Sequence, residues 1–274
     1  SYLALFLIVL ALLGLELFDR YLSSEKGTRW YYQDLTHQPL SIQYTSSGLR
    51  YLSIGEADKP PLVLVHGAPG SCMDWKGFAL FPQIYDHYRL LIVERPGYGG
   101  TRPRGAEKSI ETQARRILEV LADETQAAVV MGHSYGGPVA MVMAALSPEK
   151  IAQVIGVAGA YSPDHEVTFA ISHYVKFGIF KYLLPRMLWV SNVEKLSHPA
   201  SLRAIEPFYE KIKVPVVLLH STIDRLVPYE NATYLIERLS DDAQLLTWQD
   251  VAHPVQMNQP QLLIDFLLKQ KIVQ

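Results

Sequence analysis

The chain has little of what builds covalent or metal cross-links. Cys72 is the only cysteine among its 274 residues, which excludes a disulfide within the chain and a metal site made of several cysteines. Charge of one sign is also lacking, because the formal net charge is −2 and Lys and Arg form no cluster. The composition therefore gives no sign of a nucleic-acid partner.

Internal repeats and low-complexity segments are absent from the sequence as well. What it does contain is apolar: hydrophobic residues make up 49% of the chain, enough for a large core in one α/β domain or two smaller ones. The chemistry inferred below needs no metal and no organic cofactor. The sequence does not decide the oligomeric state.

The N-terminal segment is the most apolar part of the chain. Glu16 is its only charged residue between positions 2 and 18. A helix of this length rises roughly 26 Å, slightly less than the ~30 Å hydrocarbon core of a bilayer, and Tyr21 and Leu22 extend it into the interface. We therefore expect a single transmembrane anchor over residues 1–22, a linker over residues 23–40, and a protein that the anchor attaches to a membrane.

Two other interpretations of this segment stay open. A cleaved signal peptide needs a basic leader and a cleavage site between small residues, and neither occurs in the sequence. A helix buried in the core is the second alternative. Basic residues after the apolar run (Arg20, Lys26 and Arg29) favour a cytoplasmic domain only weakly, so the side of the membrane is not fixed.

Buried strands and helices alternate through most of the remaining chain. Continuous apolar runs predict buried strands at residues 61–65, 88–93, 127–131, 154–158 and 214–219, with a weaker strand at 244–248. Alternating patterns separated by Ser46-Ser47-Gly48 predict a hairpin over 41–54, and helical patterns cover 109–125, 231–239 and 259–271. This order predicts an α/β fold with a mostly parallel central sheet and helices on both faces, formed by residues 41–160 and 214–274.

The interval over residues 161–213 interrupts that alternation. It is amphipathic and rich in aromatic residues, including Phe169, Tyr174, Phe177, Tyr182 and Trp189. Its length between two core strands predicts an inserted helical lid above the strand ends. Ordinary helices packed on the sheet are the alternative.

The pentapeptide over residues 132–136 (GHSYG) carries the clearest chemical signal. It follows the predicted strand 127–131 and precedes an apolar helical pattern over 137–146. A G-x-S-x-G sequence between a strand and a helix indicates a nucleophile elbow, a sharp turn that exposes the serine hydroxyl. A chance occurrence in a glycine-rich loop is the competing explanation. We take Ser134 as the candidate nucleophile.

A serine hydroxyl needs a base to take its proton and an acid to orient that base. His253 lies in the loop between the last strand and the C-terminal helix, and Asp224 follows the strand 214–219. The order Ser134, Asp224, His253 along the chain is the one found in α/β-hydrolases. Asp250 is a rival acid. His66, His133 and His220 fit polar packing around turns, and the remaining histidines have no motif.

Acyl transfer also needs hydrogen-bond donors for the oxyanion that develops in the transition state. The turn over residues 66–70 (HGAPG) follows the strand 61–65, so its amides can face the same edge of the sheet as Ser134. Pro69 has no N–H. The backbone amides of Ala68 and Tyr135 are the candidate pair.

Together these motifs resemble the α/β-hydrolase superfamily, in the branch that includes esterases and small lipases. The resemblance covers about residues 40–274 and rests on the turn 66–70, the segment 94–99 (ERPGYG), the elbow, the segment 224–228 (DRLVP) and His253. It implies that Ser134 is the nucleophile, His253 the base and Asp224 its orienting acid, with Ala68 and Tyr135 forming the oxyanion hole.

Three details qualify the resemblance. Serine at the elbow argues against the epoxide hydrolase and dehalogenase branches, which use aspartate. Glu94 stands where aspartate is usual, and Ser221 where glycine is usual. Both departures lie outside the candidate catalytic residues and affect local packing.

The sequence therefore predicts a serine hydrolase of small carboxylic esters, including lipid-like esters suited to an apolar lid. Cleavage of amides, peptides or carbon–carbon bonds by the same residues is one alternative. A non-catalytic binding protein on the same scaffold is another.

Overall fold

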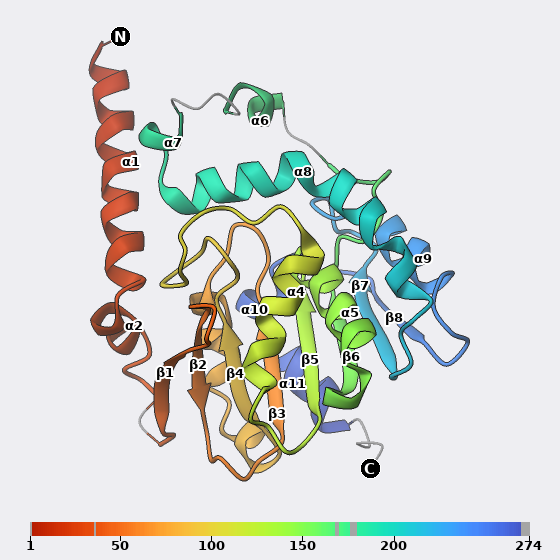
Figure 1. Ribbon diagram of the computed structural model, residues 1–274. Coiled ribbons are helices and arrows are strands. Elements are labelled where there is room, and N and C mark those ends of the chain that lie inside the picture. Colours follow the sequence, from red (N-terminus) through yellow and green to blue (C-terminus); the bar gives the residue numbers. More distant parts are fainter. Residues whose placement is uncertain (1, 36, 168–169, 176–179, 270–274) are drawn as a thin grey trace.

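The computed structural model describes residues 2–35, 37–167, 170–175 and 180–269. Eight strands form one sheet in the order β1-β2-β4-β3-β5-β6-β7-β8 (Figure 1). Their bounds are β1 Leu40–Tyr44, β2 Arg50–Ile54, β3 Pro61–Val65, β4 Arg89–Val93, β5 Ala128–His133, β6 Ile151–Val157, β7 Val216–Ser221 and β8 Gln244–Trp248.

The sheet is antiparallel at one edge and parallel elsewhere. β1 pairs with β2, and β2 with β4, in antiparallel register, which confirms the predicted hairpin. Every pairing from β4 to β8 is parallel. β3 and β5 are buried along their whole length, as continuous apolar runs require in a sheet covered on both faces.

Helices cover both faces of this sheet (Figure 1). One core cluster joins the sheet to α4 (Ile110–Leu118), α5 (Gly136–Leu146), α8 (Arg186–Tyr209) and α9 (Glu230–Ile236). The other joins it to α3 (Lys76–Ala79), α10 (Val255–Asn258) and α11 (Pro260–Lys269). Short 3₁₀ turns complete the fold: η1 Cys72–Trp75, η2 Pro82–Asp86, η3 Glu119–Leu121 and η4 Pro148–Lys150.

The described residues between β6 and β7 include the helices α6 (Ala170–Val175), α7 (Phe180–Leu183) and α8. Leu202, Ile205 and Tyr209 of α8 are buried in the first core cluster. The C-terminal part of α8 therefore packs on the domain as a core helix does. Its N-terminal part continues toward α7 (Figure 1).

The N-terminal helix α1 (Tyr2–Leu22) corrects one prediction. Among the described residues, no helix is long and apolar enough to span a bilayer. The apolar part of α1 ends at Glu16, which pairs with Arg20 at 2.6 Å and accepts a hydrogen bond from the Arg186 amide at 2.7 Å. The residues before Glu16 rise roughly 21 Å, well short of a ~30 Å hydrocarbon core. The predicted transmembrane anchor, and the membrane localisation and membrane partner that depended on it, are therefore wrong.

The predicted linker over residues 23–40 contains a short helix, α2 (Glu25–Tyr31). Ser24 caps this helix by accepting a hydrogen bond from the Gly27 amide at 3.0 Å. Tyr32 is buried and donates its hydroxyl hydrogen to the Cys72 carbonyl at 2.6 Å. These contacts fasten the segment to the domain.

Candidate active site

Ser134 lies at the sharp turn between β5 and α5. Its φ angle is +54°, in the left-handed region that costs a non-glycine residue about 1–3 kcal/mol. A Cβ on Gly132 would approach the Gly136 carbonyl oxygen to 2.2 Å, and a Cβ on Gly136 would approach the Val65 oxygen to 2.4 Å. The two glycines of the pentapeptide are therefore required by the close approach of strand and helix.

Asp224 and His253 are brought together from two loops at the carboxyl ends of β7 and β8. His253 Nδ1 lies 2.6 Å from Asp224 Oδ2. The other carboxylate oxygen accepts hydrogen bonds from the amides of Leu226 and Val227 at 2.9 and 3.0 Å. Asp250 is exposed and, within the described part of the chain, makes no hydrogen bond or ion pair with His253.

The electrostatics of Asp224 follow from these contacts. Burial raises the pKa of its carboxyl group, but the hydrogen bond and charge of His253 and the two amides outweigh burial and lower the pKa below its usual value. Asp224 is therefore ionised at neutral pH. An ionised carboxylate accepts the Nδ1 proton of His253, which leaves the Nε2 atom free to act as a base.

Ser134 and His253 line one cavity of about 580 Å³, together with Ala68 and Tyr135. All the candidate site residues except Asp224 thus meet at a single cavity, and Asp224 reaches it through His253. No hydrogen bond joins Ser134 to His253 in this structure; such bonds are often long before a substrate is bound.

The turn over residues 66–70 lies directly against Ser134. A Cβ on Gly67 would lie 3.0 Å from the Ser134 Cβ, so only glycine allows this approach without displacing the serine. No loop or turn hydrogen bond of the described residues uses the amides of Ala68 or Tyr135. Both amides are therefore available to an oxygen in the cavity.

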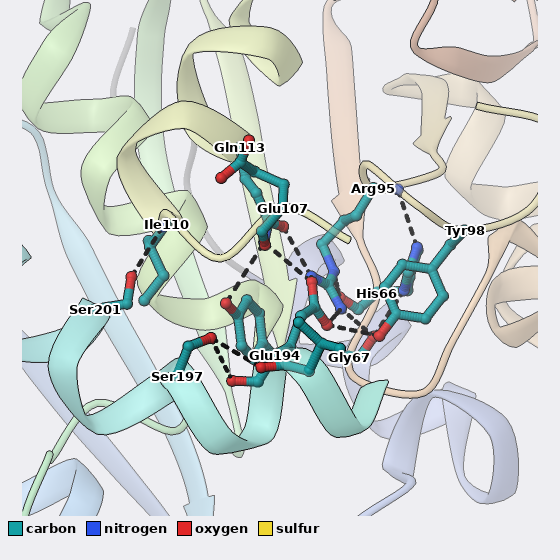
Figure 2. Close-up of polar contacts among 12 residues, drawn as sticks. His66, Gly67, Arg95, Tyr98, Glu107, Ile110, Gln113, Glu194, Ser197 and Ser201 are labelled. Carbon is teal, nitrogen blue, oxygen red and sulfur yellow. Dashed lines mark hydrogen bonds and ion pairs between the residues drawn. The ribbon is translucent and has the colours of Figure 1, made fainter. Parts of the chain in front are cut away.

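A buried ion pair holds this turn in place, and the sequence analysis missed it. Arg95 donates hydrogen bonds to the carbonyl oxygens of His66 at 2.9 Å and Gly67 at 2.7 Å. Its guanidinium also pairs with Glu194 of α8 at 2.7 Å, and both side chains are fully buried. Figure 2 shows the guanidinium between the turn and the Glu194 carboxylate.

Two further side chains complete the hydrogen bonds of Glu194. Tyr98 donates its hydroxyl hydrogen to Oε2 at 2.6 Å, and Gln113 donates to Oε1 at 3.0 Å (Figure 2). The sequence did carry a signal for half of this network, since Arg95 and Tyr98 belong to the ERPGYG segment. Nothing in the sequence pointed to Glu194.

The other histidines at the sheet edge act in packing, as predicted. His66 Nε2 accepts a hydrogen bond from the Arg95 amide at 3.1 Å. His133 and His220 contact the carbonyl oxygens of His253 and Val227, each at 2.9 Å. Burial lowers the pKa of His133 to about 3, so this ring is neutral beside His253.

The two departures from the family pattern have local partners. Glu94 forms a buried ion pair with Arg50 at 2.6 Å and accepts a hydrogen bond from the Gly100 amide at 2.6 Å. Ser221 Oγ accepts a hydrogen bond from the Val251 amide at 3.3 Å. No group of three His, Cys, Asp or Glu side chains within the described ranges is arranged to hold a metal ion.

The comparisons with known proteins agree with this geometry. A family model described as the alpha/beta hydrolase fold matches residues 60–178. The structure of naproxen esterase (carboxylesterase NP) from Bacillus subtilis superposes with a TM-score of 0.62 at 18% identity, over 90% of this chain and 98% of that one. The chain therefore has the α/β-hydrolase fold.

Among curated proteins, this chain resembles pimeloyl-[acyl-carrier protein] methyl ester esterases. The Klebsiella pneumoniae (strain 342) enzyme is 37% identical over 108 residues, which is 39% of each protein. The match thus spans well under half of that relative's length. The Sodalis glossinidius enzyme is 26% identical over 258 residues, covering 80% of this chain and 97% of the relative.

Proposed function

We propose that this α/β-hydrolase cleaves carboxylic esters through an acyl-enzyme on Ser134. The observation that carries the proposal is the 2.6 Å contact between Asp224 and His253, at the cavity that Ser134 also lines. The relatives named above are esterases, which supports the same reaction class. The oxyanion donors in this proposal are the amides of Ala68 and Tyr135.

In the first half of the reaction, His253 Nε2 takes the proton of Ser134 Oγ while Oγ attacks the carbonyl carbon of the ester. The amides of Ala68 and Tyr135 stabilise the negative charge that develops on the carbonyl oxygen. Asp224 stabilises the imidazolium that forms. The bond to the leaving oxygen then breaks, and His253 transfers its proton to the departing alcohol.

In the second half, water repeats the sequence on the acyl-enzyme. His253 takes a proton from the water as its oxygen attacks the acyl carbon, and the tetrahedral intermediate again places its negative charge at the two amides. Collapse releases the carboxylic acid and returns the proton to Ser134. Every step uses groups of this chain and water.

We assign the lid to residues 161–213, because part of this segment forms one wall of the cavity. Its aromatic residues predict a lipid-like acyl group. Tyr174 and Tyr182 are, however, 66% and 81% exposed, and Trp189 does not line the cavity beside Ser134. Phe169 and Phe177 lie outside the described residues. The proposal therefore covers esters in general.

Substitution of Ser134 by Ala tests the mechanism. Ser134→Ala should lower turnover of p-nitrophenyl acetate at least about 10³-fold, because the nucleophile is lost. The matched control is Ser197→Ala, since the Ser197 hydroxyl bonds only to backbone oxygens of its own helix, at 2.9 and 3.0 Å. A fluorophosphonate probe should label the parent at Ser134 and leave Ser134→Ala unlabelled.

Two results would count against the proposal. A Ser134→Ala variant with parental turnover would exclude the mechanism. A folded parent that neither hydrolyses the acetate ester nor reacts with the probe would indicate a binding protein. An amide or carbon–carbon substrate cleaved faster than its matched ester would assign the same residues to the alternative reaction.

A further inference from the structure

The cavity beside Ser134 is lined by the core loops and by the segment between β6 and β7. The core loops contribute apolar side chains (Ala68, Pro69, Leu226, Val227, Pro254 and Met257) together with the polar side chains of Asp74, His133, Ser134, Tyr135, His253 and Gln256. The wall from the segment between β6 and β7 is mainly polar: Glu166, Ser172, Ser191, Asn192, Lys195 and His198, with Met187 as its apolar member. A substrate in this cavity therefore meets polar groups of the segment between β6 and β7 as well as those of the core loops.

The polar wall is built on one face of α8. Met187, Ser191, Lys195 and His198 follow one another at intervals of four, four and three residues, the spacing that places side chains along one side of a helix. The same helix is fixed by the Glu194–Arg95 ion pair. The polar groups are thus presented by a rigid element.

Glu166 fixes two of these groups to each other. It pairs with His198 Nδ1 at 3.1 Å and with Lys195 Nζ. Burial raises the pKa of Glu166, but the hydrogen bonds and charges of His198 and Lys195 lower it below its usual value, so Glu166 is ionised. The His198 ring stacks on Tyr135 with centroids 4.4 Å apart, which places this cluster beside the residue that follows Ser134.

Two other polar groups of the wall have unused hydrogen-bonding capacity. Within the described part of the chain, neither Ser191 Oγ nor Asn192 Oδ1 has a partner, although Asn192 Nδ2 donates to the Ser172 carbonyl at 3.2 Å. A serine hydroxyl both donates and accepts hydrogen bonds, whereas an amide oxygen accepts. A hydroxyl group, which donates one hydrogen bond and accepts others, satisfies both.

We propose that this cavity selects esters that carry a free hydroxyl group on the acyl or the alcohol part, which Ser191 and Asn192 bind. Ser191 donates to or accepts from the substrate hydroxyl, and Asn192 Oδ1 accepts its hydrogen. The apolar side chains of the core loops hold the hydrocarbon part of the same substrate. This inference rests on the proposed ester hydrolysis and adds a substrate class to it.

The test compares esters that differ only in the presence of free hydroxyl groups, one on the acyl side and two on the alcohol side. For the acyl side the pair is p-nitrophenyl hexanoate and p-nitrophenyl 6-hydroxyhexanoate; for the alcohol side it is propyl butyrate and glyceryl monobutyrate. We expect the hydroxylated ester of one pair to have a kcat/KM about tenfold higher, which corresponds to about 1.4 kcal/mol. Ser191→Ala and Asn192→Leu should each reduce that preference several-fold.

Ser197→Ala is the matched control, because its hydroxyl lies on the same helix but bonds to backbone oxygens. It should keep the parental preference. Equal kcat/KM within both pairs, or a preference for the alkyl ester, would overturn the inference while acetate turnover upheld ester hydrolysis. Absence of acetate turnover in the parent would overturn both. A hydroxyl preference that survives in both variants would refute the roles of Ser191 and Asn192.

Discussion

The ion pair between Arg95 and Glu194 gives the sharpest prediction, because it joins the cavity wall to the oxyanion turn. Glu194→Gln keeps the shape of the side chain and removes its charge. The Arg95 guanidinium would then be buried with only carbonyl oxygens and neutral groups as partners. Both side chains are 0% exposed, and the paired atoms are 2.7 and 3.2 Å apart, so solvent cannot compensate for the lost charge.

The expected loss of stability follows from this burial. Removing one partner of a buried ion pair costs about 3–5 kcal/mol, far more than the 0–1 kcal/mol of an exposed pair. For a chain of this size, that corresponds to a fall in Tm of roughly 6–20 °C. Glu111→Gln, which breaks the exposed pair with Arg115, should change Tm by much less.

The activity should fall for a separate reason. Arg95 holds the carbonyl oxygens of His66 and Gly67, so a displaced guanidinium moves the amide of Ala68. Loss of a whole oxyanion donor costs about 10²–10³ in kcat; a displaced donor should cost about tenfold, with a smaller change in KM. Activity is to be measured on folded protein, at a temperature well below the Tm of the variant.

The matched control is Glu94→Gln, which uncouples the equally buried Arg50–Glu94 pair. It should lose similar stability and keep its kcat, because Arg50 contacts no carbonyl of the oxyanion turn. The reasoning would be refuted if Glu194→Gln lost less than about 1 kcal/mol. It would also be refuted if both variants lost kcat equally, since the effect would then be general to buried charge.

Two further predictions concern Gly136 and Asp74. Gly136→Ala should destabilise the fold by at least about 1–3 kcal/mol, because its Cβ would meet the Val65 oxygen at 2.4 Å. Gly105→Ala is the control, since a Cβ at Gly105 meets nothing within 4 Å. Equal denaturation midpoints for the two variants would contradict this prediction. Burial raises the pKa of Asp74 to about 7 from 3.8, so the parent should lose stability relative to Asp74→Asn as pH rises from about 4 to about 7, by at most about 4 kcal/mol. Melting curves at about pH 5 and about pH 8 measure this change, and a constant difference between the two proteins would contradict it.

Much of the fold was decided by local patterns in the sequence. The buried strands β3, β5 and β7 are continuous apolar runs, and their order with the intervening helices specifies a parallel sheet. The elbow is equally local: Gly132, Ser134 and Gly136 fit only a strand that turns sharply into a helix. Because parallel strands end at one edge, the sequence also placed Asp224 and His253 near Ser134.

Only the tertiary structure decided which side chains meet across long separations. Arg95 and Glu194 are 99 residues apart, and no periodicity pairs a buried arginine with one of several scattered glutamates. The polar face of α8 was hidden for the same reason, since helical spacing does not say which face meets the cavity. The N-terminal segment was wrongly predicted to span a membrane because its hydropathy takes no account of contacts with the rest of the chain. In the structure, Glu16 of α1 accepts a hydrogen bond from the backbone amide of Arg186. Local sequence patterns determine the helices, the strands and the edge of the sheet at which the strands end. The contacts that give the cavity its chemistry arise only when elements distant in the sequence pack together.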